Sequence, residues 1–213
     1  MIDLTSITEE IQTAWTTKSA ARDEAISRSR ELIRRCAEAI RAIHRREWAQ
    51  ADEKLAIVRE GTQEIRAVVA NYPDLYYSGY TQDALKEMVE AHVTYAIIRN
   101  TDLPTPTTLN VEYSTYLNGL GEAATELRRF ILDILRREDG DSSEAERLLD
   151  WMDAVYDELV TIDFPDAITG GLRRQTDVVR GVLERTRGDL TMTLRQQRMQ
   201  AALQRFEERT LKD

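Results

Sequence analysis

The chain has 213 residues, a formal net charge of -9 and 42% apolar residues. Its nine glycines and four prolines make up about 6% of the sequence, roughly half of the share in an average globular protein. A β-sandwich or another fold with many turns needs more of these residues, so we expect long helices. The length suits one domain with a substantial core. No apolar run reaches the ~18 residues that a membrane span needs, so we expect no membrane partner.

Cysteine and histidine usage limits both the compartment and the metal chemistry. The single cysteine, Cys36, forms no intrachain disulfide, which fits a reducing cytoplasm. The first residues have neither the basic flank nor the apolar stretch of a signal peptide, so we expect a cytoplasmic protein. One cysteine and two histidines also exclude a Cys/His zinc cluster. Any metal ion must therefore be held mainly by carboxylates.

Charge is spread unevenly along the sequence. Residues 18–46 carry nine basic and four acidic side chains, residues 138–166 carry eleven acidic side chains and one arginine, and residues 172–213 carry ten basic and six acidic ones. Two basic segments inside an acidic chain favour polyanion binding. Arginines that face water beside glutamates on long helices produce the same pattern, so this alternative stays open.

The first two predicted helices occupy the first 70 residues. Thr5 and Ser6, followed by acidic residues, resemble an N-cap, and no Pro or Gly interrupts the sequence from there to about Arg46. Apolar residues in this stretch recur at three- and four-residue steps, which is the helical period. A second helix follows over about 47–70, with Gly61 as its weak point.

The next segment contains a turn and a third helix. Pro73 removes a backbone donor and biases the preceding residue away from helical geometry, so residues 71–74 are predicted to form a turn. After Gly79, Thr81 is expected to cap a helix that ends near Asn100. This third helix is apolar over most of its length.

The rest of the chain is divided by Pro, Gly, Asp and Ser. It comprises a loop over 102–108, a fourth helix over about 111–137, a turn over 138–141, a fifth helix from Ser142 or Ser143 to about 161, and a sixth helix over most of 166–209. The predicted fold class is therefore all-α. We expect a single-domain bundle over residues 1–213, with about six to seven helices and long first and last helices.

Two pairs of glutamates stand at helical spacings. Glu87 and Glu90 are three residues apart in the third helix, and Glu122 and Glu126 are four apart in the fourth, so each pair lies on one helix face. The residues around them are mostly small or apolar, which favours packing against another helix. Like charges repel, and more strongly when desolvated. A positive group, either an arginine or a metal ion, should therefore lie between them.

Oxygen ligands of this kind favour Mg²⁺ or Mn²⁺. Such an ion beside a phosphodiester can activate water and stabilise the leaving oxygen. The Glu-x-x-His motif of di-iron bundles is absent, because Glu90 and Thr125 stand where the histidines would be. Acid pairs at these spacings also occur on solvated helices, or paired with residues such as Arg128 and Arg129. Spacing alone therefore does not decide for a metal site.

Three stretches resemble the translin superfamily, which comprises translin, translin-associated factor X (TRAX) and archaeal and bacterial relatives. Residues 79–98 contain Glu-Met-Val-Glu-Ala, and residues 115–129 contain Tyr-Leu-Asn-Gly followed by Glu-Leu-Arg-Arg. These runs are similar to the family's Glu-x-x-Glu-Ala, Tyr-Leu-x-Gly and Glu-Leu-x-Arg patterns. Residues 28–45 are similar to its first helix, which ends in an apolar-His-Arg step.

The resemblance implies a metal-dependent endoribonuclease that acts on single-stranded RNA as a hollow homo-octamer with inward-facing active sites. Four acidic residues form the site in TRAX-like members, and they match Glu87, Glu90, Glu122 and Glu126. These residues would hold Mg²⁺ or Mn²⁺. Glu122 stands where Asp is common in TRAX, which lengthens one ligand by a methylene. Translin itself lacks the full set, so the alternative is a non-catalytic binder of single-stranded RNA or DNA.

A shell that binds RNA inside also needs arginines that neutralise phosphates. The candidates share one face of the first helix or follow the last glutamate by three residues: Arg30, Arg34, Arg41, Arg45 and Arg129. Few aromatic residues accompany them, so we expect weak sequence preference. Single-stranded RNA is the expected partner and single-stranded DNA is left open. A helical interaction protein whose charges only face solvent is the third alternative.

His92, His44 and Cys36 are predicted to pack rather than to catalyse. His92 lies two residues past Glu90 and so points about 200° away from it around the helix, which argues against a shared metal ion. His44 and Cys36 continue the apolar stripe of the first helix.

Overall fold

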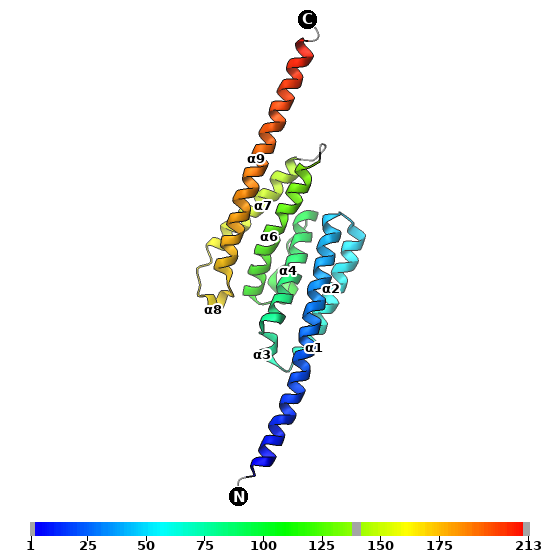
Figure 1. Ribbon diagram of the computed structural model, residues 1–213, viewed down its shortest axis with the longest axis vertical. Coiled ribbons are helices and arrows are strands. Elements are labelled where there is room, and N and C mark those ends of the chain that lie inside the picture. Colours follow the sequence, from blue (N-terminus) through cyan, green and yellow to red (C-terminus); the bar gives the residue numbers. More distant parts are fainter. Residues whose placement is uncertain (1–2, 138–141, 211–213) are drawn as a thin grey trace. The chain divides into compact units, whose positions relative to one another are not determined.

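The prediction of an all-α fold is confirmed. The computed structural model describes residues 3–137 and 142–210, and these residues form nine helices and no strand (Figure 1). The helices are α1 (Leu4–His44), α2 (Trp48–Val69), α3 (Pro73–Tyr76), α4 (Gly79–Arg99), α5 (Pro106–Leu109), α6 (Tyr113–Leu135), α7 (Ser142–Val160), α8 (Asp166–Thr169) and α9 (Leu172–Thr210). The first and last helices are long, as expected, with 41 and 39 residues. The predicted turn over 138–141 lies outside the described residues.

The described residues form two compact units. Unit 1 comprises residues 3–95 and 104–119, and unit 2 comprises residues 96–103, 120–137 and 142–210. The helices α4 and α6 run from one unit into the other, so two of the boundaries fall inside helices, and the third, between residues 103 and 104, falls in the loop before α5. A single domain over the whole chain stays a prediction.

In unit 1, α1 and α2 lie side by side and turn tightly at Arg46, whose φ of 57° is left-handed. The buried residues of α1 recur at helical spacing, which is the stripe that the sequence predicts: Ala25, Ser29, Leu32, Cys36, Ala39, Ile40, Ala42 and Ile43. Gly61, the predicted weak point of α2, does not break the helix. The helix continues through it, and a Cβ there would lie 3.4 Å from Leu32 Cδ1. The missing side chain lets the two helices approach.

The predicted turn over 71–74 contains a short helix instead. Pro73 begins α3, because its missing N–H is unpaired at the first helical position anyway. Leu75 then packs on Ala25 and Val69 in the core of unit 1. Thr81 does not cap α4, which already starts at Gly79. Its Oγ1 instead donates to the carbonyl of Leu75 at 2.8 Å, so it fixes the angle between α3 and α4.

The predicted loop over 102–108 also contains a helix, α5. Thr105 Oγ1 accepts from the backbone N–H of Thr108 at 3.1 Å, Pro106 occupies the first turn, and Asn110 ends the helix in a left-handed conformation with φ 52°. Arg66 of α2 donates to the carbonyls of Leu109 and Asn110. The last turn of α5 is thus fixed to α2.

Unit 2 is built on α7 and α9, which pack together, and on the part of α6 from Leu120 onward. Gly121 of α6 lies against Gln175 of α9, where a Cβ would be 2.8 Å from Gln175 Cγ. Arg128 of α6 donates to Thr186 Oγ1 at 3.1 Å and to Asp189 at 2.8 Å. Small residues and this polar link together hold α6 to α9.

The sixth predicted helix is interrupted near its start. Gly170 and Gly171 have φ values of 60° and 87°, which end α8 and let the chain turn into α9. Beyond the packed part of unit 2, the end of α9 is exposed, as is the beginning of α1 in unit 1. Within the described residues, no helix is both long and apolar enough to cross a membrane.

Candidate active site

The first predicted pair, Glu87 and Glu90, lies on α4 in unit 1. Both side chains are half-buried, whereas their neighbours Leu85, Met88 and Val89 are buried. The carboxylates therefore occupy the polar edge of an otherwise apolar helix. Their spacing of three residues puts them on one face, as the sequence predicts.

Cys36 of α1 lies close to this pair. Burial raises the pKa of the Cys36 thiol, and the negative charges of Glu87 and Glu90 raise it further. The thiol is fully buried, so it stays protonated and belongs to the core, as expected. Both carboxylates thus face α1 closely enough for their charges to act on one side chain.

The start of α6 packs directly on α4 inside unit 1. A Cβ added to Gly119 would lie 2.7 Å from Val89 Cβ and 2.8 Å from the carbonyl oxygen of Lys86. Real Cβ atoms essentially never come this close, so only glycine allows this approach. The contact involves Lys86 and Val89, which directly precede Glu87 and Glu90.

The second predicted pair, Glu122 and Glu126, lies on α6 in unit 2. Both side chains are half-buried, and Ala123 and Ala124 between them are fully buried. Arg128, which the sequence offers as a possible partner of the pair, donates to Thr186 and Asp189 of α9 instead. The structure thus places each pair on one face of its own helix, with one pair in each unit.

Sequence reasoning missed a pocket of about 550 Å³ within unit 1. Arg59 and Arg66 of α2 line it together with His92 of α4 and residues of α5. His92 is buried, as predicted, and burial lowers its pKa, with the positive charge of Arg59 acting in the same direction. No linear motif points to this pocket. The one signal in the sequence was the spacing of the two arginines, which puts both on one face of α2.

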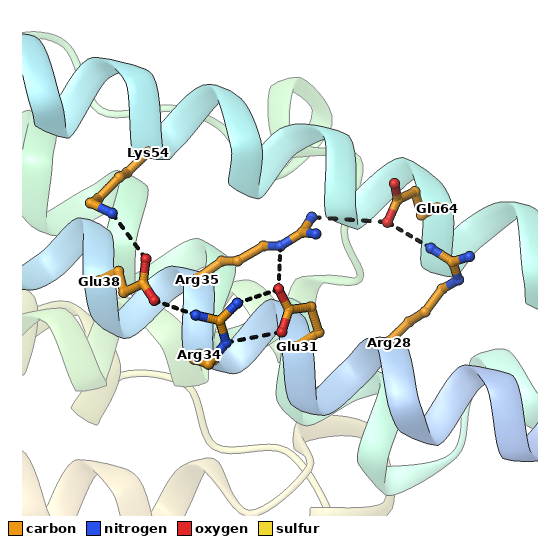
Figure 2. A network of polar contacts seen from close by, with 7 residues as sticks. All are labelled: Arg28, Glu31, Arg34, Arg35, Glu38, Lys54 and Glu64. Carbon is orange, nitrogen blue, oxygen red and sulfur yellow. Dashed lines mark hydrogen bonds and ion pairs between the residues drawn. The ribbon is translucent and has the colours of Figure 1, made fainter.

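The candidate RNA-binding arginines differ in their surroundings. Figure 2 shows Arg34 held between Glu31 and Glu38 of its own helix, at 2.6 and 2.5 Å. Arg45 lies 3.8 Å from Glu47, with both side chains largely exposed. The other three, Arg30, Arg41 and Arg129, are exposed and form no ion pair within residues 3–137 and 142–210.

Other members of the basic segment bind α1 to α2. Arg28 donates to Glu64 of α2 at 2.7 Å, and Lys54 of α2 donates to Glu38 of α1 at 2.9 Å (Figure 2). The guanidinium groups of Arg34 and Arg35 lower the pKa of Glu31 to about 2. Part of the positive surplus of residues 18–46 is therefore a structural ion network.

The chain is similar to several known proteins, although no family model matches it. The uncharacterized protein MJ0175 of Methanocaldococcus jannaschii is 30% identical over 192 residues, which cover 89% of this chain and 84% of that protein. The crystal structure of AfC3PO is 32% identical with a TM-score of 0.79, over 87% of this chain and 96% of that one.

A second structure, that of an AfC3PO–duplex RNA complex, has a TM-score of 0.77 and is also 32% identical, over 87% of this chain and 95% of that one. Apo-NeC3PO has a TM-score of 0.76 over 91% of this chain and 98% of that one. At 22% identity it supports the fold alone.

Proposed function

Because the chain belongs to the translin superfamily, we propose that it is a metal-dependent endoribonuclease that cleaves single-stranded RNA. In this proposal Glu87 and Glu90 of α4 join Glu122 and Glu126 of α6 in one active site. The resemblance noted in the sequence supports the choice of these four residues.

The donor set fits a hard divalent cation. Four carboxylates offer only oxygen ligands, which Mg²⁺ and Mn²⁺ prefer. All four side chains are half-buried, and like charges repel more strongly in such surroundings than in water. A cation would relieve that repulsion. When bound, it would polarise the scissile phosphodiester and lower the pKa of a water molecule.

One observation carries the proposal, namely the approach of Gly119 to the backbone of α4 inside unit 1. The two helices that carry the acids touch at Lys86 and Val89, directly beside Glu87 and Glu90. Glu122 follows Gly119 by three residues, which is about one helical turn along α6. A contact at this position favours the meeting of the two pairs.

The residues of the chain would then have separate roles. The four carboxylates hold the cation, and one of them accepts a proton from the attacking water. The new bond would form between the water oxygen and phosphorus, the bond from phosphorus to the leaving ribose oxygen would break, and the proton taken up by the carboxylate would pass to that oxygen. Arg129 follows Glu126 by three residues and is exposed, so its guanidinium group can pair with a neighbouring phosphate.

RNA binding is the second part of the proposal. One of the AfC3PO structures is a complex with duplex RNA, which supports RNA as the ligand class and makes duplex RNA a necessary comparison. Arg30 and Arg41 are exposed and without ion pairs in the described part of the chain. They are therefore available to phosphates, whereas Arg34 would have to leave two carboxylates.

We further propose that the protein acts as a homo-oligomer, with an octamer as the expected form. Leu4, Ile7, Ile11 and Trp15 form an exposed apolar stripe at helical spacing near the start of α1. Met199, Leu203 and Phe206 do the same near the end of α9. Exposed apolar stripes of this length are typical of surfaces that another chain covers.

The test is cleavage of labelled RNA by substituted proteins. Glu90→Gln and Glu126→Gln keep the size of the side chain and remove its charge. Loss of a group that only orients a metal ligand commonly costs 10–100-fold, so loss of a ligand itself should slow cleavage by at least about 100-fold. Single-stranded RNA affinity, measured by fluorescence anisotropy with EDTA present, should change little.

Glu60→Gln is the matched control, because Glu60 is an exposed glutamate of α2 and lies outside the proposed site. It should cleave RNA like the unsubstituted protein. Cleavage that survives both site substitutions would reject the assignment of the active site to these glutamates. If instead the unsubstituted protein binds RNA equally well with and without EDTA but never cleaves it, the protein is a non-catalytic binder. Single-stranded and duplex RNA of one sequence are compared in each assay.

A further inference from the structure

The pocket of unit 1 has the size of a small-molecule site. Its volume is about 550 Å³, within the roughly 300–1,000 Å³ of pockets that bind organic ligands. Three elements form its walls, namely one face of α2, one face of α4, and α5 with its flanking residues. They contribute Arg59, Thr62, Gln63, Arg66, Met88, His92, Pro104, Thr108, Leu109 and Asn110.

The charges in the pocket are all positive. Arg59 and Arg66 lie seven residues apart on one face of α2, and no aspartate or glutamate lines the pocket. Neither arginine forms an ion pair within the described residues. Arg66 uses Nη2 to donate to the carbonyls of Leu109 and Asn110, while its Nε is buried and has no hydrogen-bond partner. A half-buried cation without a counter-ion favours an anionic ligand.

His92 adds a hydrogen-bond acceptor to a pocket whose charged groups are donors. Its side chain is 6% exposed, and Nδ1 donates to the carbonyl of Met88 at 2.9 Å. That bond fixes the tautomer, so Nε2 is the acceptor of the neutral ring. Nε2 is buried and has no hydrogen-bond partner in the described structure. An unsatisfied buried acceptor is destabilising, and a ligand hydroxyl or amine that donates to it would remove this cost.

The pocket is separate from the proposed nuclease site. Met88 and His92 are four residues apart and share one face of α4, and His92 points about 200° away from Glu90 around the helix. Met88 and His92 are buried, whereas Glu87 and Glu90 are half-buried. A ligand in the pocket would therefore lie on the other side of α4 from the carboxylates.

We propose that this pocket binds a phosphate monoester of a hydroxyl-bearing compound, of the size of a nucleoside monophosphate. The phosphate pairs with Arg59 and Arg66, a hydroxyl or amine donates to His92 Nε2, and the organic body lies on Met88, Pro104 and Leu109. This function goes beyond RNA cleavage and does not depend on it.

Two features of the pocket select this class. Arginine forks match the oxygen geometry of phosphate, and two guanidinium groups balance a dianion. A bare phosphate ion would fill only a small part of 550 Å³ and would leave the apolar wall and His92 without contacts. The ligand therefore needs an organic body with a donor group.

Isothermal titration calorimetry of the full chain with AMP tests the proposal. AMP should bind once per chain, inorganic phosphate should bind more weakly, and adenosine should not bind detectably. Arg59→Gln should weaken AMP binding by about tenfold, which corresponds to about 1.4 kcal/mol, because the phosphate loses one charged hydrogen-bond donor. Arg59 is exposed, so the substitution should not disturb folding.

Arg174→Gln is the matched control, because Arg174 is an exposed arginine of α9 in unit 2 and should leave AMP binding unchanged. A second readout is histidine ¹⁵N NMR, which is simple here because the chain has two histidines. AMP should shift the Nε2 resonance of His92 and leave that of His44 in place.

The proposal is wrong if millimolar AMP gives neither heat nor a His92 shift, or if Arg59→Gln binds AMP as well as the unsubstituted protein. Equal affinity for AMP and inorganic phosphate would also overturn it, because the organic body would then make no contribution. None of these readouts uses RNA cleavage, so their failure is distinguishable from failure of the nuclease.

Discussion

Gly119 and Val89 bring α6 and α4 into contact at a distance that no other residue at position 119 allows. An added Cβ would lie 2.7 Å from Val89 Cβ and 2.8 Å from a backbone oxygen, so at least one helix must shift to accept it. The glycine follows Tyr-Leu-Asn in the sequence, inside the motif that resembles the family. Its presence in the middle of a 23-residue helix, where glycine is unfavourable, is thereby explained.

We therefore predict that Gly119→Ala destabilises the protein. Overpacking typically costs 1–3 kcal/mol, and the better helix propensity of alanine returns about 1 kcal/mol. The free energy of unfolding should fall by up to about 2 kcal/mol in urea denaturation at a fixed protein concentration. RNA cleavage should fall as well, because the shift moves α6 relative to Glu87 and Glu90.

Gly188 provides the matched control in α9, because nothing lies within 4 Å of an added Cβ there. Gly188→Ala should raise the free energy of unfolding by about 0.5–1 kcal/mol, from helix propensity alone. Equal effects of the two substitutions would contradict the close contact.

The long helices could be predicted because their cause is local. Apolar residues at three- and four-residue steps form the buried stripe of α1, and Pro165, Gly170 and Gly171 separate α7 from α9. The short helices α3 and α5 were missed for a local reason too. Pro73 and Pro106 indicate breaks when the sequence is considered alone, although proline is also favoured at the first position of a helix.

The pocket could not be predicted, because its walls come from three separate elements. Arg59 and His92 are 33 positions apart in the sequence, and nothing in either segment indicates that they meet. The ion network of α1 and α2 could not be predicted either, because the partners of Arg28 and Lys54 lie on the neighbouring helix. Helical period predicts which face is buried, but it does not predict what the polar face binds.

The carboxyl group of Glu31 should titrate far below its ordinary range. Hydrogen bonds from Arg34 and Arg35 lower its pKa from 4.5 to about 2. A ¹³C NMR titration of the folded protein should show this midpoint. Arg34→Gln should move the pKa back toward 4.5, and by more than Arg35→Gln does, because the bond from Arg34 is the largest cause.

The sign of the pH dependence follows from this shift. Since the pKa is lower in the folded state, the contact stabilises the protein fully above about pH 4.5, and its contribution is lost progressively as the pH falls toward 2. Arg34→Gln should therefore flatten the pH dependence of stability in that window. A Glu31 midpoint near 4.5 in the unsubstituted protein would show that the network does not form.

The same network predicts that the basic residues of α1 contribute unequally to RNA binding. Arg30 is exposed and without an ion pair in the described residues, whereas Arg34 is held by Glu31 and Glu38. Arg30→Gln should weaken single-stranded RNA binding and reduce the slope of log K against log salt by about 0.7, the value for one phosphate contact. Arg34→Gln should change both quantities less. An equal loss for the two variants would mean that Arg34 leaves its carboxylates to bind RNA.

The apolar stripe at the start of α1 leads to a prediction about assembly. Leu4, Ile7 and Trp15 are 67%, 49% and 70% exposed. A neighbouring chain that covered them would gain about 25 cal/mol for each Å² of apolar surface buried. Replacing all three with serine should lower the mass measured by light scattering toward the 24.5 kDa of one chain, with helix content by circular dichroism nearly unchanged. The unsubstituted protein should have a mass several times larger.

The control replaces the three exposed residues Thr5, Thr8 and Thr13 of the same helix with serine, which leaves the stripe intact. A monomeric unsubstituted protein, or a triple stripe variant that keeps its full mass, would contradict assembly through this surface.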